Sequence, residues 1–591
     1  MMKPEEQMDF SDILTVDYLA PYRGKETGAA QLFCDGGRKH ESLDGNWHYS
    51  PDPYNTCLRQ RWFEERYEDP LGNSLPVDYS FDDWPVMRLP CCWNLQEEKL
   101  FWYEGAMVFT RTFRFLPGKA DERVFLRLGA ANYMTRVFLN GQFVGSHEGG
   151  STPCCFDLTP YLQKDNRVVI VVDSSRDPRY VPSENTDWFN YGGLYREIGL
   201  YRLPPVFIRD FGVALVPDGT FGTVRVTATL SEAVDTEAVF SIPALGLQET
   251  LTVRKGVLSV DLPCAPELWS PEHPKVYRVT LETGADAVTD EVGFREIRVV
   301  GREILLNGQP IFLKGISCHE DSIPHGKAVT LAECEQAILD AKALGCNFMR
   351  LAHYPHTEQM ARAADRLGIL LWEEIPVYWT IRFSDPEVLA RAENQLRELI
   401  LRDRNRASVI IWSVGNENPD SDARFAFMRH LVYTARALDG TRLLSAACLV
   451  STEKNAIADR LADELDIIGV NQYFGWYVPN FDLLPQLFEN SRPDKPVILT
   501  EFGADALYGH HGTEADKGTE ECQAYIYTRQ LREIEKIDYV RGMTPWLLYD
   551  FRSPRRVNVL ENGFNRKGLI SGDRLGRKLA WQVLHDFYAQ K

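Results

Sequence analysis

Eight short apolar runs, separated by helical stretches, fill the chain from Gly301 to the C-terminus. Runs of this length are typical of buried strands, and their alternation with helices predicts parallel strands joined by crossover helices. Eight such strands close a (β/α)8 TIM barrel, so we expect that fold over residues 300–591. The runs lie around Phe312 and at 347–351, 369–372, 409–414, 443–446, 467–470, 497–499 and 542–548.

The clearest helix of this region is predicted to begin after Thr330. Thr330 and Glu333 have the spacing of a capping box, in which each side chain bonds the backbone N–H of the other residue. Apolar residues then recur on one helical face, and Gly345 ends the pattern. The residues of that face are Cys334, Ile338, Ala341 and Leu344.

The part of the chain before residue 300 has short strands, frequent turns and no sustained helical period. Asn140-Gly141 between two apolar runs predicts a tight hairpin, and residues 1–205 are typical of a jelly-roll β-sandwich. Residues 206–299 alternate apolar and polar positions, as an immunoglobulin-like β-sandwich does. We therefore expect a multidomain β and α/β protein of three domains, which suits its 591 residues.

The composition argues against several classes of protein. Acidic residues outnumber basic ones by 84 to 65, which gives a net charge of −19 and disfavours nucleic acid and membranes as partners. The first residues lack the apolar run of a signal peptide, and no stretch reaches the roughly 18 apolar residues of a membrane span, so we expect a cytoplasmic protein. The twelve cysteines lack the spacing of zinc sites, and we expect free thiols and no metal.

Two glutamates directly follow predicted barrel strands. Glu417 comes after the fourth strand and Glu501 after the seventh. Barrel enzymes carry their chemistry at the C-terminal ends of the strands, and two carboxylates facing one sugar ring are the minimum for retaining glycoside hydrolysis. Taken alone, an Asn-Glu pair after a strand can also cap the next helix.

Other strand ends are rich in polar and aromatic residues. His319, His353, Asn471 and Tyr473 each follow a predicted strand and are candidates for the pocket. The alternative for each histidine is a hydrogen-bonded position in the core. No phosphate-binding loop, dinucleotide turn or metal-binding helix competes with a carboxylate mechanism, and we expect no cofactor.

Several segments together resemble glycoside hydrolase family 2, and within it the β-glucuronidases. The resemblance covers nearly the whole chain, and the family has the domain order jelly roll, immunoglobulin-like sandwich, barrel. The matching segments include Asn416-Glu417, Thr500-Glu501-Phe502-Gly503, 189–196, His319-Glu320-Asp321, 350–355 and 471–477.

The resemblance implies roles for individual residues. Glu417 is expected to be the acid/base, Glu501 the nucleophile and Asn416 a partner of the sugar 2-hydroxyl. It further implies that Asp157 reaches into the pocket from the first domain. The residues expected to line the pocket are His353, Asn471, Tyr473, Tyr477 and Trp546.

The segment Asn565-Arg566-Lys567 resembles the Asn-x-Lys motif with which these enzymes bind the carboxylate of a uronic acid. A lysine ammonium on a carboxylate makes a strong, charge-assisted hydrogen bond. One departure concerns Glu561, which stands where β-glucuronidases have an arginine near the sugar C4 and C6 groups. That change leaves the preference between glucuronate and galacturonate open, and the roles of Arg555 and Arg556 stay open too.

We therefore predict a retaining exo-β-hexuronidase that acts on terminal β-D-glucuronides, β-D-galacturonides or both. Two alternatives are a β-galactosidase on the same scaffold and a non-catalytic carbohydrate-binding protein. The connection after Pro376 is shorter than in some relatives, which predicts an open site for the aglycone. The resemblance also implies a homo-oligomer.

Overall fold

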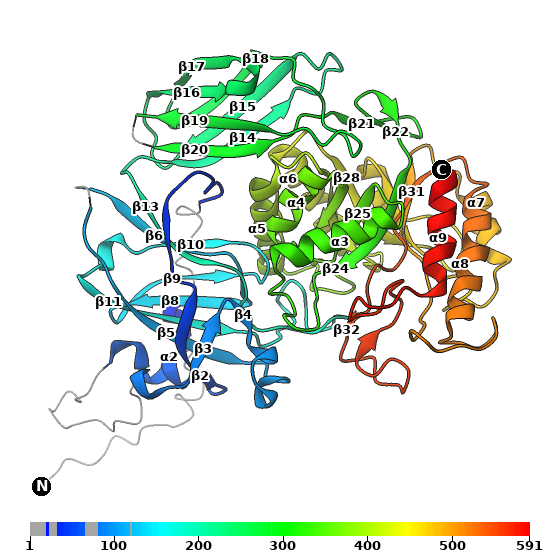
Figure 1. Cartoon of the computed structure of the whole chain (residues 1–591), viewed down its shortest axis with the longest axis horizontal. Coiled ribbons are helices and arrows are strands. Elements are labelled where there is room, and N and C mark those ends of the chain that lie inside the picture. Colours follow the sequence, from blue (N-terminus) through cyan, green and yellow to red (C-terminus); the bar gives the residue numbers. More distant parts are fainter. Residues whose placement is uncertain (1–18, 23–31, 66–80, 119–120, 285) are drawn as a thin grey trace, which may run out of the picture.

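The computed structural model describes residues 19–22, 32–65, 81–118, 121–284 and 286–591. Figure 1 shows a closed barrel with one β-sandwich beside it and a second sandwich across another side. The predicted fold class is confirmed. The predicted domain limits at residues 205 and 299 stay predictions.

The first sandwich has a six-stranded and a four-stranded sheet, with a small third sheet beside them. The six-stranded sheet runs β3 (Val86–Leu89), β2 (Gly45–Asp52), β5 (Ala106–Arg114), β11 (Asp165–Asp173), β8 (Met134–Leu139) and β9 (Gln142–Glu148). The four-stranded sheet runs β1 (His40–Ser42), β13 (Ile198–Leu203), β6 (Arg123–Leu128) and β10 (Cys154–Asp157). The third runs β4 (Cys91–Cys92), β12 (Gly193–Leu194) and β7 (Ala131–Asn132), and α2 is Thr56–Gln60.

The predicted hairpin joins β8 to β9. Asn140 and Gly141 have φ values of 50° and 79°, and a two-residue turn of type I′ needs positive φ at both positions. This prediction is confirmed.

The second sandwich packs a three-stranded sheet on a four-stranded one around an apolar core. The first sheet runs β14 (Ile208–Leu215), β15 (Thr223–Leu230) and β18 (Val257–Pro263). The second runs β17 (Leu247–Val253), β16 (Thr236–Ile242), β19 (Tyr277–Thr283) and β20 (Ala287–Val292). A short sheet of β21 (Ile297–Val300), β22 (Glu303–Leu306) and β23 (Gln309–Pro310) leads into the barrel.

Eight parallel strands close the barrel, and each predicted run falls on one of them. They are β24 (Leu313–His319), β25 (Phe348–Ala352), β26 (Leu370–Glu374), β27 (Val409–Asn416), β28 (Leu443–Leu449), β29 (Ile468–Asn471), β30 (Val497–Glu501) and β31 (Val540–Met543). The last strand ends earlier than the predicted 542–548. Pro545 follows two residues after β31 and has no N–H with which to continue the ladder.

Helices cover the outside of the barrel (Figure 1). They are α3 (Leu331–Ala343), α4 (Glu358–Leu367), α5 (Pro386–Asp403), α6 (Asp422–Leu438), α7 (Leu483–Ser491), α8 (Glu520–Ile534) and α9 (Leu579–Gln590). The capping box of Thr330 and Glu333 is present at the start of α3, as predicted. In the described ranges, no helix has the length and apolar composition needed to cross a membrane.

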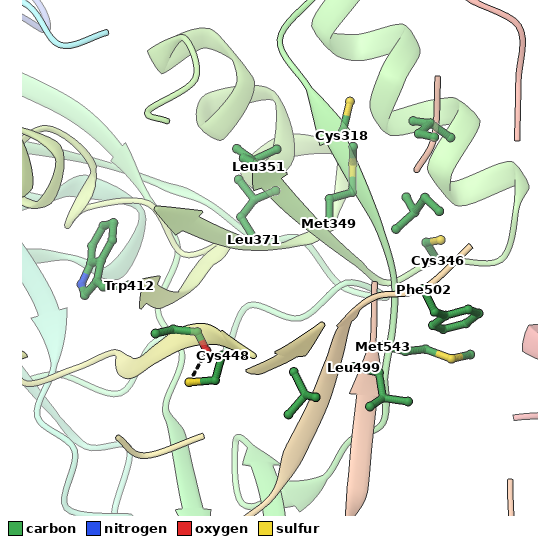
Figure 2. Packing of buried hydrophobic residues seen from close by; sticks show 14 of the residues in the cluster. Cys318, Cys346, Met349, Leu351, Leu371, Trp412, Cys448, Leu499, Phe502 and Met543 are labelled. Atoms are coloured by element: carbon green, nitrogen blue, oxygen red, sulfur yellow. Dashed lines mark hydrogen bonds between the residues drawn. The ribbon is translucent and has the colours of Figure 1, made fainter. Parts of the chain in front are cut away.

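Alternate residues of the barrel strands face opposite ways. Met349, Leu351 and Leu371 belong to the apolar layer shared by the strands and the surrounding helices, part of which Figure 2 shows. Phe348 and Leu370 instead belong to the apolar cluster that includes the first residues of several strands. Polar side chains therefore gather toward the opposite, C-terminal ends of the strands, where the mouth of the barrel lies.

A buried arginine joins the second sandwich to the barrel. Arg295 lies between β20 and β21 and donates to the backbone carbonyls of Ala407, Val409 and Thr441 at 3.1, 2.5 and 3.0 Å. Burial, and next the charge of Arg442, hold the pKa of Arg295 well below its usual range. The carbonyl contacts fix the sandwich against the N-terminal side of β27 and β28.

We expect Arg295→Met to destabilise the protein by about 2 to 4 kcal/mol, because it leaves buried carbonyl groups without donors. Thermal unfolding followed by circular dichroism measures the effect. Arg298→Met is the matched control, since Arg298 is three residues away and its side chain is 49% exposed. Equal, small shifts of the unfolding midpoint in both variants would contradict this role.

Candidate active site

The two predicted catalytic glutamates stand at the mouth of the barrel. β27 ends at Asn416, directly before Glu417, and Glu501 is the last residue of β30. Glu417 has a φ of 51°, a left-handed conformation that is uncommon outside glycine, and its N–H bonds the carbonyl of Ala447 at 2.8 Å. Strained backbone of this kind tends to persist where the surroundings fix a side chain for function.

Two donors hold the carboxylate of Glu501. The Tyr473 hydroxyl donates to Oε2 at 2.7 Å, and Arg350 Nη1 donates to Oε1 at 2.8 Å. His353 Nε2 lies 3.9 Å from the same Oε1. One carboxylate oxygen is thus fixed by a cation and the other by a neutral hydroxyl.

Arg350 connects Glu501 to two further groups. Its guanidinium also donates to Glu374 Oε1 at 2.8 Å and to Asn416 Oδ1 at 2.7 Å. Burial raises the pKa of Glu374, but Arg350 and His353 more than offset this, and the pKa is held at about 2. Glu374 therefore stays ionised and keeps Arg350 in place.

Glu417 lies in a different electrostatic environment. Burial, and next the negative charge of Glu501, raise its pKa to about 7, while a hydrogen bond from Trp379 lowers it. Trp379 Nε1 donates to Glu417 Oε2 at 2.7 Å. At neutral pH a large share of Glu417 is protonated, so it suits a general acid.

The amide of Asn416 has one free donor. Its Oδ1 accepts from Arg350 and also from Asn471 Nδ2 at 3.2 Å. Its Nδ2 is buried and bonds no atom of the described residues. A buried amide N–H with no protein partner is suited to a sugar hydroxyl.

Lys567 is linked to Glu501 through two tyrosines. Its ammonium lies 5.2 Å from the centre of the Tyr477 ring, and the rings of Tyr477 and Tyr473 are 5.1 Å apart. Lys567 is only 1% exposed and donates to Asp505 Oδ2 at 2.7 Å. Although burial lowers it, the charge of Asp505 raises the pKa of Lys567 above its ordinary value, so the lysine stays cationic.

Asp187 reaches the barrel from the first sandwich, and the expectation for Asp157 is wrong. Asp157 ends β10, where its side chain bonds Arg123 at 2.7 Å and the N–H of Thr159 at 3.0 Å. Both oxygens are thus used within the sandwich. Asp187 instead accepts from Ser553 at 2.7 Å, across the domain boundary.

Arg556 lies between two carboxylates beside Asn565. It bonds Asp187 at 2.5 Å and Glu561 at 3.3 Å, and Asn565 Nδ2 lies 3.4 Å from Asp187. Burial, and next the charge of Asp505, raise the pKa of Glu561. Asp187, Arg556 and Glu561 therefore form one group, in which a guanidinium lies beside Glu561.

The two predicted histidines pack with aromatic rings. His353 donates from Nδ1 to Glu374 Oε1 at 2.8 Å, and its ring stacks on that of Trp546 with the centroids 4.9 Å apart. His319 bonds the Tyr354 hydroxyl at 3.0 Å through Nδ1, while its buried Nε2 bonds no described atom. Burial, and next the charge of His353, hold the pKa of His319 well below its usual range, so its ring is neutral.

The structure thus brings together all the predicted site residues except Asp157. Four further residues lie beside them that the sequence pattern did not single out for the pocket: Arg350, Glu374, Trp379 and Asp187. The sequence marked Arg350 and Glu374, since each is a charged residue in a barrel strand that is mostly apolar. Trp379 and Asp187 lie in irregular loops, where no periodicity marks them.

A barrel with this pair of glutamates at its mouth defines the chain as a glycoside hydrolase. Residues 297–586 match the model described as the TIM barrel domain of glycosyl hydrolases family 2. Residues 40–204 match the sugar binding domain of that family, and residues 206–295 match a further model described as glycosyl hydrolases family 2. The chain belongs to glycosyl hydrolase family 2.

Relatives of known name are similar over nearly their full length. The β-glucuronidase of Mus musculus is 31% identical, covering 93% of this chain and 91% of the relative. That of Paenibacillus borealis is 29% identical, covering 91% and 95%. Among solved structures, the β-glucuronidase of an uncultured Clostridium sp. has a TM-score of 0.82 at 25% identity over 94% of this chain and 98% of that one. A β-galacturonidase from Eisenbergiella tayi bound to galacturonate has a TM-score of 0.79 at 24% identity, with the same coverage.

We expect Glu417 to titrate near pH 7, and Trp379→Phe to raise its pKa further, because the lost indole hydrogen bond stabilises the carboxylate. Carbon-13 NMR of protein labelled at the glutamate carboxyl carbons measures both, with the signal assigned through its loss in Glu417→Gln. Trp102→Phe, which alters an exposed indole, is the control. Titration near the ordinary glutamate value of about 4.3 would contradict the site's electrostatics.

Proposed function

We propose that this chain is a retaining exo-β-hexuronidase, which hydrolyses terminal β-D-glucuronides and β-D-galacturonides without a cofactor. The observation that carries the proposal is Lys567, a buried cation joined through Tyr477 and Tyr473 to Glu501. A neutral galactoside offers no carboxylate to this ammonium, whereas a uronic acid does. The family is a retaining one, and its named relatives include β-glucuronidases.

The residues support a two-step reaction. A Glu501 oxygen forms a bond to the anomeric carbon as the glycosidic bond breaks, and the departing oxygen takes the proton of Glu417. Water then gives a proton to Glu417 and attacks the anomeric carbon, which releases Glu501. Arg350 and Tyr473 position the nucleophile, and the elevated pKa of Glu417 supplies the acid at neutral pH.

The first sandwich supports an exo mode of action. Trp188, next to Asp187, packs on the pocket residues His353 and Tyr378, with ring centroids 5.8 and 4.8 Å away. We propose that this packing closes the pocket behind a terminal sugar and so blocks a chain that continues beyond it.

The choice between the two uronides depends on the wall of Asp187, Arg556 and Glu561. Glucuronate and galacturonate differ at C4 alone, and this wall offers both a guanidinium and carboxylates to that hydroxyl. Both glucuronides and galacturonides are therefore proposed substrates. The homo-oligomeric state, the cytoplasmic location and the absence of nucleic acid and membrane partners stay predictions.

An assay panel tests the proposal with nitrophenyl β-glucuronide, β-galacturonide and β-galactoside. We expect Glu501→Gln to lower turnover of every substrate at least about a thousandfold, because the nucleophile is lost. We expect Lys567→Ala to lower kcat/KM for the uronides about 10- to 100-fold, because a hydrogen bond to a charged group is lost.

The matched control is Lys517→Ala. Lys517 is exposed and lies 4.7 Å from the centre of the Trp476 ring, which Lys567 approaches to 5.7 Å. Unfolding midpoints of all variants show whether the fold persists. A wild-type preference for the galactoside, or equal losses on all three substrates in Lys567→Ala, would refute the recognition of a uronic carboxylate.

A further inference from the structure

Arg555 places an exposed guanidinium beside the proposed acid. Its central carbon lies 4.8 Å from the centre of the Trp379 ring, and Trp379 is the residue that donates to Glu417. Its Nη1 lies 3.3 Å from the side-chain oxygen of Asn185 in the first sandwich. Three separate segments therefore meet around this one arginine: the loop after β26, the segment after β32 (Phe551–Arg552) and a loop of the sandwich.

The proposed reaction indicates which part of the substrate lies near Arg555. Glu417 gives its proton to the oxygen that joins the sugar to its aglycone, so the aglycone lies on the Glu417 side of the scissile bond. Trp379 borders Glu417 on one side, and Arg555 covers the Trp379 ring. An aglycone bound for hydrolysis thus lies within reach of the Arg555 guanidinium.

Among the residues that the structure describes, no carboxylate forms an ion pair with Arg555. Its one hydrogen-bond partner in these ranges is the neutral amide of Asn185. By contrast, its neighbour Arg556 is paired with both Asp187 and Glu561. In a chain with a net charge of −19, a free cation at the pocket mouth is a local attraction for anions.

Two of the next four residues along the chain are apolar and open to solvent. Val557 and Val559 are 81% and 95% exposed, and they continue the segment that carries Arg555. The same segment lies on the side of the barrel that faces the first sandwich (Figure 1). An exposed apolar surface therefore follows the Arg555 guanidinium along the chain.

We propose that Arg555 forms part of the aglycone subsite and favours leaving groups that carry a negative charge. The chemical class is a uronide whose aglycone is itself acidic, either a second acidic sugar or an acidic aryl group. This inference rests on the proposed function, since it needs Glu417 to act as the acid. Arg555 is thus a specificity-determining residue for the leaving group.

The test compares two aryl uronides that differ only in one para group, a carboxylate in the first and a carboxamide in the second. The measured quantity is the ratio of their kcat/KM values. The ratio in Arg555→Gln is divided by that in the wild type, which cancels the difference in leaving-group chemistry. We expect this double ratio to fall about three- to fivefold, the upper part of the range for one exposed charge pair.

Two further variants separate charge from shape. Arg555→Lys keeps the charge and should keep most of the preference for the carboxylate. Arg577→Gln is the matched control, because Arg577 is also exposed and lies 4.2 Å from the centre of a tryptophan ring, that of Trp581 on α9. Raising the salt concentration from about 20 to about 500 mM should reduce the wild-type preference, since exposed charges are screened.

A second pair of substrates distinguishes the two sources of negative charge. These are disaccharides in which a uronic acid is linked to either a uronate or the matching neutral sugar. A fall in the double ratio for the disaccharides assigns the subsite to acidic glycans, and a fall for the aryl pair alone assigns it to acidic small molecules.

Three results would overturn the inference. The first is an unchanged double ratio in Arg555→Gln for both pairs. The second is an equal loss on charged and neutral aglycones, which would mean that Arg555 only supports Trp379. The third is a wild-type protein that cleaves none of these uronides, which would refute the proposed function and this inference with it.

Discussion

Inside the barrel, the guanidinium of Arg350 bonds Glu374, Glu501 and Asn416 at once. It has no exposed surface, and a buried cation is costly unless carboxylates pair with it and accept its N–H groups. The apolar cluster at the other end of the strands keeps water away from this network and strengthens its hydrogen bonds. The orientation of Glu501 and of the Asn416 amide therefore both depend on one arginine. Loss of Arg350 would leave two buried carboxylates to repel each other.

The pocket is assembled from two domains, so the first sandwich is part of the site. Asp187 bonds Ser553 and Arg556 on the barrel side, and Asn185 bonds Arg555. The domains are also held together by contacts such as that of Arg196 with Glu320 at 3.0 Å. The proposed walls around the sugar and the aglycone thus depend on how the first sandwich packs on the barrel, whereas Glu417 and Glu501 both lie at the ends of barrel strands.

The sequence predicted the parts of this structure that follow from periodicity and from strand ends. Eight apolar runs were enough to find the barrel strands, and the position after a strand was enough to select Glu417 and Glu501 as candidates. Asp187 was missed, and Asp157 was chosen in its place. The partners of Asp187 lie more than 360 residues away in the chain, and no local sequence pattern indicates such a pairing. Trp379 was missed for a related reason: its loop conformation, with a φ of 51°, is fixed by tertiary contacts. The site assignments and domain limits stay predictions.

The central claim is that Glu501 attacks the sugar while Arg350 and Tyr473 hold its carboxylate in place. The most direct test is to treat the protein with a 2-deoxy-2-fluoro-β-glucuronyl fluoride, which forms the glycosyl-enzyme quickly and releases it slowly, and to map the modified peptide by mass spectrometry. We predict a single adduct on Glu501. An adduct on Glu417, or hydrolysis of the fluoride with no adduct on any residue, would contradict it.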